Sequence, residues 1–169
     1  MLRILIVEDD GQLASTLKYL IEDNPRYRVV GIAEDLDGAI SAVEADEPDL
    51  ALVDLHLARG CTGFSVAVRL NDAGIPVLFV SGKAPSFPMP DLALGILLKP
   101  FTGDEVYRAL ATAEDLMRGR ENLRKRVPAN LKLYETSDQA PQNGAEEPGL
   151  ISRPSFRARL QQWVAGTTH

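Results

Sequence analysis

Cysteine is scarce in this sequence of 169 residues, and long apolar runs and an excess of positive charge are absent from it. The single cysteine, Cys61, excludes an internal disulfide framework and is compatible with a reducing compartment. The apolar runs are short and interrupted, so no segment is predicted to span a membrane. The chain starts directly in an apolar run, residues 2–7, without the charged leader and cleavage site of a secretory signal. We therefore expect a cytoplasmic protein.

Negative charge is concentrated in the first hundred residues, and the whole chain has a formal net charge of −6. Residues 1–101 hold eight Lys or Arg against fifteen Asp or Glu, a balance of −7, whereas residues 102–126 hold six against five. This acidic block argues against general nucleic-acid binding, which needs a basic face. It suits a site in which carboxylates gather around a cation.

Strand-like and helix-like segments alternate along the first 122 residues. Apolar patterning predicts strands over residues 4–7, 27–33, 50–54, 75–80 and 95–98, and helices over 12–23, 35–47 and 64–71. A further helix opens at the capping box formed by Thr102 and Glu105. Such alternation is typical of a parallel sheet with helices on both faces. Residues 81–95 interrupt it, because Pro85, Pro88 and Pro90 favour a loop or one distorted turn there.

The third predicted strand, residues 50–54, is apolar except for the carboxylate that ends it, Asp54. Burying an unpaired carboxylate is costly, and doubly wound sheets place their sites at the carboxyl ends of parallel strands. Asp54 is therefore a site candidate. The other strand ends carry polar residues that should converge on the same edge of the sheet: Glu8, Asp9, Asp10, Ser81 and Lys99.

These residue types suit phosphoryl chemistry. Close carboxylates repel one another unless a cation lies among them, and a few oxygen ligands completed by water suit Mg²⁺. A lysine, a hydroxyl and a divalent ion around one carboxylate can hold the oxygens of a transferring phosphoryl group. Since a carboxylate is itself a competent nucleophile for that group, Asp54 is the expected acceptor.

Four motifs in order resemble the receiver domain of two-component response regulators. They are Ile-Leu-Ile-Val-Glu-Asp-Asp at residues 4–10, Leu-Val-Asp at 52–54, Val-Ser-Gly at 80–82 and Leu-Leu-Lys-Pro-Phe at 97–101. The resemblance covers residues 1–122 and indicates a bacterial signalling protein. It implies an α/β fold with a flavodoxin-like, doubly wound, five-stranded parallel sheet of order 2-1-3-4-5. The proline-rich segment indicates that the fourth helix of that fold is short or missing here.

The resemblance implies roles for Asp54, Asp9, Glu8 and His56. Asp54 would accept a phosphoryl group from a phosphohistidine on a partner kinase. Asp9 and Asp54 would ligate Mg²⁺ directly, Glu8 would hold it through water, and the backbone carbonyl of His56 would be a further ligand. The side chain of His56 is expected to be exposed, with at most a modulating effect on phosphate lifetime.

The same resemblance implies that Ser81 bonds a phosphoryl oxygen in the activated state, with Gly82 leaving room for the ligand. Lys99 would pair with the phosphate, and the Lys99–Pro100 bond would be cis, as is accessible only before proline. The aromatic switch residue of the family falls at Ile96, so the usual coupling of hydroxyl and ring lacks its aromatic ring here. Plainer alternatives stay open, with Ser81 as a turn residue and the acids at 8–10 as helix-start residues.

Residues 76–82, Pro-Val-Leu-Phe-Val-Ser-Gly, partly resemble the P-F-x-F-[A/S]-[T/S]-G segment of a subgroup of small stand-alone receivers. That subgroup has a pliable segment at the fourth helix and often pairs with an atypical kinase family. Val77 and Val80 depart from its pattern.

Beyond the receiver region the sequence predicts a helix end and flexible linker over residues 123–150, and a tail over 151–169. The tail has apolar residues at i, i+4, i+7 and i+8, which indicate a short amphipathic helix, although a disordered tail is an equal alternative. The last receiver helix, continued to Arg126, or this tail could mediate a homodimer. The apolar positions of the tail are Phe156, Leu160, Trp163 and Val164.

We expect a phosphorylation-dependent switch that uses Mg²⁺, receives its phosphoryl group from a sensor histidine kinase or phosphotransfer protein, and acts on a downstream protein. It would catalyse its own phosphorylation and dephosphorylation without being a metabolic enzyme. Two alternatives are a DNA-binding transcriptional regulator and an aspartyl-phosphate-type phosphatase. Fewer than thirty residues follow the linker, too few for a helix-turn-helix, so nucleic acid is an unexpected partner.

Overall fold

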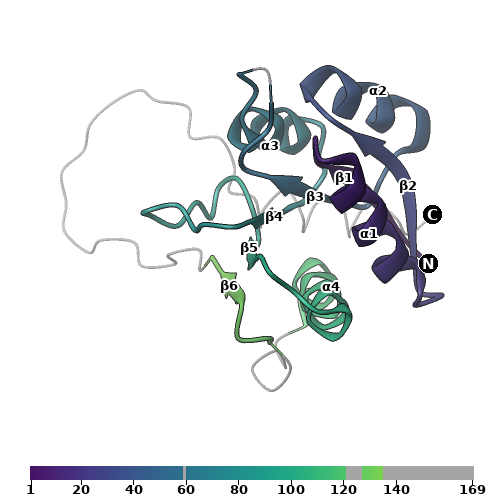
Figure 1. The fold of residues 1–169 in the computed structure, drawn as a ribbon, viewed down its shortest axis with the longest axis vertical. Helices are drawn as coiled ribbons and strands as arrows, with labels where there is room; N and C mark the ends of the chain where they lie inside the picture. Colours follow the sequence, from purple (N-terminus) through teal and green to yellow (C-terminus); the bar gives the residue numbers. More distant parts are fainter. Residues whose placement is uncertain (59, 121–126, 135–169) are drawn as a thin grey trace.

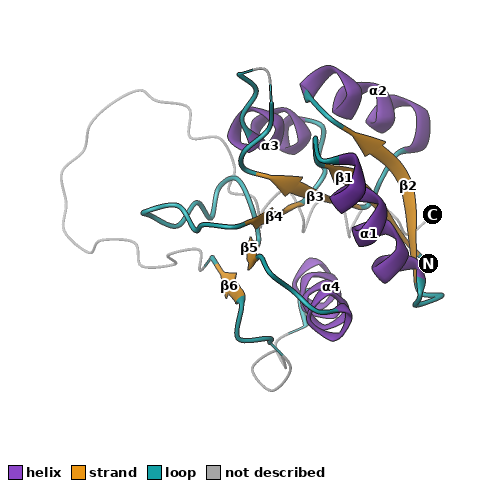
Figure 2. Ribbon diagram, viewed as in Figure 1, coloured by secondary structure: helices purple, strands orange, loops and turns teal. Residues whose placement is uncertain are grey.

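A six-stranded sheet with helices on both faces forms the framework of the molecule (Figures 1 and 2). The computed structural model describes residues 1–58, 60–120 and 127–134. The strand order is β2-β1-β3-β4-β5-β6, and the first five strands run parallel. This confirms the predicted α/β class and the order 2-1-3-4-5. The strands are β1 (Leu2–Val7), β2 (Tyr27–Ala33), β3 (Leu50–Asp54), β4 (Val77–Ser81), β5 (Gly95–Leu98) and β6 (Leu131–Leu133).

Side-chain caps fix the beginnings of the four helices of the described chain, which are α1 (Gly11–Glu22), α2 (Leu36–Asp46), α3 (Gly63–Asp72) and α4 (Gly103–Met117). Asp10, Asp35 and Thr62 each accept a hydrogen bond from a backbone N–H of the first turn that follows. Thr102 and Glu105 form the capping box that the sequence predicts. These caps satisfy donors that a helix start otherwise leaves without partners.

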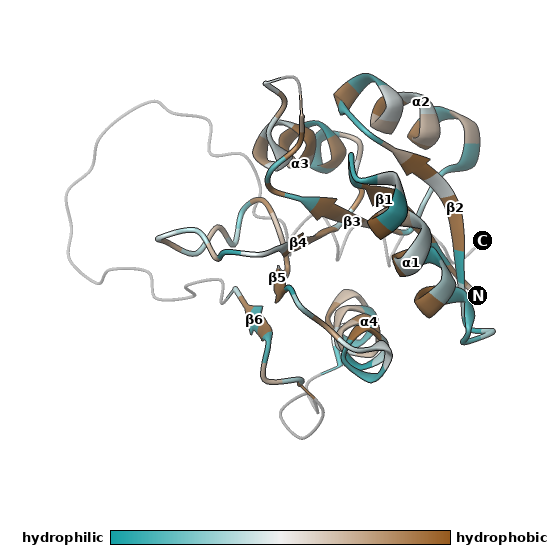
Figure 3. Ribbon diagram, in the orientation of Figure 1, coloured by the Kyte–Doolittle hydropathy of each residue, from teal (hydrophilic) through white to brown (hydrophobic). Residues whose placement is uncertain are grey.

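Two apolar layers enclose the sheet. Successive residues of β1 point to opposite faces, so Ile4 and Ile6 pack with α1 and α4, whereas Leu5 and Val7 pack with α2 and α3. Figure 3 shows hydrophobic residues concentrated on the strands, where a sheet covered on both faces needs them. No helix among the described residues is long and apolar enough to cross a bilayer.

Residues 82–94, between β4 and β5, contain no helix, as the prolines predict. The end of this segment is anchored, because the N–H of Leu94 donates to the carbonyl of Val77 and both Ala93 and Leu94 are buried. Its middle reaches solvent, and Phe87 is 62% exposed. The helix that the expected fold places between its fourth and fifth strands is therefore replaced by a loop.

Strand β6 was not predicted. It lies within the segment that the sequence assigns to a flexible linker, and it pairs antiparallel with β5. The N–H of Leu98 donates to the carbonyl of Asn130, while the side-chain amide of Asn130 donates back to the carbonyl of Leu98. A side chain at Gly95 would bring its Cβ within 2.3 Å of the Lys132 carbonyl oxygen, so glycine permits this pairing. The linker prediction is thus wrong for these residues.

Helix α4 is shorter than predicted, since the sequence suggests a continuation to Arg126 and the helix ends at Met117. Gly119 follows with φ of 66°, a left-handed conformation that suits glycine and ends a helix. The predicted tail helix and the remainder of the linker lie outside the described residues.

Candidate functional site

The carboxyl ends of β1, β3, β4 and β5 bring the predicted residues to one edge of the sheet. Lys99, directly after β5, bonds two carboxylates at once: its Nζ lies 2.7 Å from Asp54 Oδ2 and 2.9 Å from Glu8 Oε2. Asp54 is the last residue of β3, and Glu8 follows β1 directly. Parallel pairing in register makes these separate segments meet.

Both carboxylates that share Lys99 are buried, with 4% of Glu8 and 7% of Asp54 exposed. Burial raises the pKa of Glu8, and the hydrogen bond from Lys99 opposes that rise. Burial acts to lower the pKa of Lys99, but its bonds to Asp54 and Glu8 outweigh burial, and the net shift is upward. One lysine therefore faces two carboxylates in a poorly hydrated place, which leaves an excess of negative charge.

Asp9 adds a third carboxylate. Oxygens of Glu8, Asp9 and Asp54 all lie within 4.8 Å of one another. Asp9 Oδ2 also accepts a hydrogen bond of 3.0 Å from the N–H of Ala58. Asp10 differs from these residues, because its side chain caps α1 instead of joining the cluster. Three carboxylates against one ammonium form an oxygen-rich set that fits a hard divalent cation such as Mg²⁺.

The loop between β3 and α3 folds back over Asp54. The N–H of His56 donates to Asp54 Oδ1 at 3.0 Å, and His56 forms an isolated antiparallel bridge with Thr62. A Cβ at Gly63 would lie within 2.2 Å of the Asp54 carbonyl oxygen, so only glycine fits here. Gly63 is a site-supporting residue that sequence reasoning missed, although a glycine at a helix start close after the acidic strand was a signal.

Ser81, the last residue of β4, is fully buried. Its Oγ and His56 Nδ1 share a hydrogen bond of 3.2 Å, and its carbonyl accepts one of 2.9 Å from the N–H of Lys99. The side-chain contact between Ser81 and His56 could not be read from the sequence. A Cβ at Gly82 would have nothing within 4 Å, so the structure gives no steric reason for glycine there.

Two other predicted positions lie close to the site. The Lys99–Pro100 peptide bond is cis. Ile96 pairs with Phe79 across β4 and β5 and is fully buried in the apolar layer on the α2 and α3 side. The place of the family's aromatic switch is therefore filled by an aliphatic core residue.

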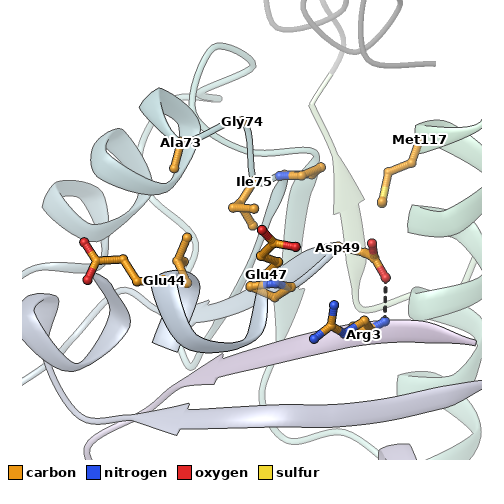
Figure 4. Close-up of a pocket in the computed structure, with 11 residues that line it drawn as sticks. Arg3, Glu44, Glu47, Asp49, Ala73, Gly74, Ile75 and Met117 are labelled. Carbon is orange, nitrogen blue, oxygen red and sulfur yellow. Dashed lines mark hydrogen bonds between the residues drawn. The ribbon is translucent and has the colours of Figure 1, made fainter. Parts of the chain in front are cut away.

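A separate pocket of about 510 Å³ lies at the opposite edge of the sheet, where strands begin (Figure 4). Arg3 lines it together with Glu44, Glu47 and Asp49, and the backbone N–H of Arg3 donates to Asp49 Oδ2. Three carboxylates against one guanidinium disfavour an anionic ligand. This pocket is thus unsuited to phosphate and is distant in the topology from Asp54.

The fold is that of a doubly wound α/β domain, and a cluster of three carboxylates that could hold a metal ion lies at the carboxyl edge of its sheet. The sequence pattern of the response regulator receiver domain matches residues 4–111. The chain belongs to that family.

Known proteins agree with this assignment. The chain is 34% identical over 82 residues to a protein-glutamate methylesterase/protein-glutamine glutaminase of Syntrophus aciditrophicus, covering 48% of the chain and 23% of that protein. It is 28% identical over 116 residues to the sensory transduction protein LytT of Bacillus anthracis, covering 65% of the chain and 46% of that protein. The chain thus spans less than half the length of these curated relatives.

Among solved structures, the chain is similar to a CheY-like response regulator receiver domain protein from Methanospirillum hungatei JF-1, with a TM-score of 0.62 and 22% identity. That alignment covers 70% of this chain and 98% of the other. At this identity the similarity supports the fold, which is the CheY-like one.

Proposed function

We propose that this protein is a phosphorylation-dependent signalling switch with Asp54 as the phosphoryl acceptor. The observation that carries the proposal is the convergence on Asp54 of a lysine ammonium at 2.7 Å and of two further carboxylates within 4.8 Å. Three carboxylates around one buried strand end repel one another, and burying them is costly unless positive charge offsets them. A site built to receive a cation and a phosphoryl group accounts for this excess.

Glu8, Asp9 and Asp54 are the side chains that would hold Mg²⁺, together with the backbone carbonyl of His56. When bound, Mg²⁺ supplies positive charge that offsets the carboxylates and the phosphoryl oxygens. Its presence in the working protein is supported by the donor set, which consists of oxygens only.

The chemical step needs little more from the protein than position and charge. An oxygen of Asp54 forms a bond to phosphorus as the bond from phosphorus to the donor breaks, and the donor leaves with the electron pair. The ammonium of Lys99, already directed at this carboxylate, neutralises negative charge on the phosphoryl oxygens. The hydroxyl of Ser81 donates to one of those oxygens once the group is in place.

The donor in the cell would be a sensor histidine kinase or a phosphotransfer protein, and the readout would be a contact with a downstream protein in the cytoplasm. These partners follow from family membership alone. The acidic amino-terminal hundred residues disfavour the basic face that DNA binding requires. A sequence-specific gel shift would favour the transcriptional alternative, and turnover of a small phosphorylated substrate the phosphatase.

The test is labelling of the full chain by acetyl phosphate, followed by intact mass. We expect one added phosphoryl group that requires Mg²⁺ and is absent in Asp54→Asn. The matched control is Asp91→Asn, which makes the same chemical change at an exposed position of the loop before β5 and should label as the wild type does. Labelling of Asp54→Asn at the wild-type rate would place the acceptor elsewhere and contradict the proposal.

A further inference from the structure

The hydroxyl of Ser81 is buried beneath an exposed histidine ring. Within the part of the chain that the structure describes, His56 Nδ1 at 3.2 Å is the hydrogen-bond partner of Ser81 Oγ. Ser81 has no exposed surface, whereas His56 is exposed. The ring therefore connects a fully enclosed polar atom of the site with the surface of the molecule.

The backbone around His56 is held independently of its ring. Its N–H donates to Asp54 Oδ1, and its bridge with Thr62 ties the loop to the start of α3, where Thr62 is the N-cap. Movement of the ring thus needs no movement of the loop. The bond between His56 and Ser81 can open while the backbone contact to Asp54 persists.

A serine hydroxyl has one proton to donate, and phosphoryl oxygens only accept. We propose that His56 Nδ1 accepts this proton in the unphosphorylated protein, and that the hydroxyl leaves His56 when it turns to a phosphoryl group on Asp54. The freed imidazole then presents the state of the site at the surface. This inference rests on the function proposed above and names the residue that senses it.

Three arguments favour this direction of exchange. A hydrogen bond to an anionic phosphoryl oxygen is stronger than a neutral one to an imidazole, so Ser81 gains by changing partner. The released ring is exposed and can bond to water without a desolvation penalty. Moreover, Ile96 is aliphatic and fully enclosed, so it offers no ring that could follow Ser81 and reach the surface.

The first experiment observes the His56 ring directly by ¹⁵N NMR of the full chain, which has only two histidines, His56 and His169. The His56 signals are assigned by their loss in His56→Asn. Beryllofluoride with Mg²⁺ serves as the phosphoryl mimic at one fixed pH. In the free wild type we expect an Nδ1 without a proton, and its resonance should shift when beryllofluoride and Mg²⁺ are added. In Ser81→Ala the resonance should already be shifted in the free protein, and the addition should barely move it.

An Nδ1 that carries the proton in the free protein would overturn the inference, because Ser81 would then keep its own proton free for phosphate. An equal response in wild type and Ser81→Ala would also overturn it, since the ring would be sensing the ligand directly. Binding of the mimic is verified by its own fluorine signal. An unchanged His56 Nδ1 resonance in protein that has bound the mimic therefore counts against the inference.

The second experiment measures the competition between His56 and the phosphoryl mimic for the Ser81 hydroxyl as a change in the affinity for the mimic. His56→Phe keeps a ring but cannot accept the proton, and His56→Asn keeps an acceptor close to the position of Nδ1; both retain the backbone groups that face the site. Losing one competing neutral hydrogen bond should lower the half-saturating beryllofluoride concentration about fivefold in His56→Phe. His56→Asn should lower that concentration less than His56→Phe does, and the difference between these two variants should vanish in a Ser81→Ala background.

Equal half-saturation of wild type and His56→Phe, or a difference that persists without Ser81, would refute the inference. The two proposals fail separately. If acetyl phosphate does not label Asp54, the proposed function is wrong. If Asp54 is labelled and binds the mimic while His56 and Ser81 behave independently, the function stands and only the exchange is wrong.

Discussion

Replacing Lys99 by methionine should destabilise the fold strongly, because the change removes the shared cation of Asp54 and Glu8. The substitution keeps most of the apolar stem and removes the charge. The two carboxylates are almost fully buried, so neither can recover its lost bond of 2.7 or 2.9 Å from bulk water. Removing one partner of a buried ion pair costs about 3–5 kcal/mol. Lys99 itself is 22% exposed, which places the expected loss at the lower end, about 3 kcal/mol.

Urea unfolding of the full chain without Mg²⁺ measures this loss. With an m value of about 1.5 kcal/mol/M, the midpoint should fall by about 2 M. The control is Lys132→Met, the same change at an exposed position of β6, which should alter the free energy of unfolding by less than about 0.5 kcal/mol. If the two variants lose equal stability, Lys99 is not the shared partner of two buried charges, and the charge argument for the site fails.

Three further predictions concern the metal, β6 and pH. Mg²⁺ at ten times its dissociation constant should stabilise the wild type by about 1.4 kcal/mol in urea unfolding, and Asp9→Asn should lose most of this gain; an unchanged gain would remove Asp9 from the ligands. Gly95→Ala should lower the free energy of unfolding by about 1–3 kcal/mol through overpacking against Lys132, and it should speed amide exchange in β6. Unchanged protection of the β6 amides would contradict this. Burial, aided by the charge of Glu114, raises the pKa of Tyr27 to about 12, so its phenol stabilises the fold below pH about 10 and loses that contribution as pH rises toward 12. The wild type should therefore lose about 2 kcal/mol more than Tyr27→Phe over that range, and parallel pH profiles would contradict this.

The absence of a helix between β4 and β5 and the presence of β6 alter the same side of the molecule. Residues 82–94 form a loop between β4 and β5, and β6 covers the outer edge of β5 with the chain's own backbone. A covered edge cannot pair with another strand. The predicted homodimer through the last helix remains a prediction, but the helix that would form it ends at Met117.

Local signals in the sequence were sufficient to predict the parallel core, the caps and the residues that meet at the candidate site. Apolar runs ending in Asp54, Ser81 and Lys99 indicate strands of a sheet buried on both faces, and parallel pairing then brings their ends together. The capping box at Thr102 and the proline-rich gap are equally local, because each acts within a few residues of backbone.

Contacts between segments that are distant in the sequence became visible only in the three-dimensional structure. Strand β6 has only three residues, among prolines and polar residues, and its pairing is stabilised by an open β5 edge and by the absence of a side chain at Gly95. The hydrogen bond between His56 and Ser81 joins residues 25 positions apart and depends on how the loop over Asp54 is held. Periodicity reports which face of an element is buried, but it contains no information about which particular side chain lies opposite. That choice is made by packing, and here it places an exposed imidazole on the buried hydroxyl of the site.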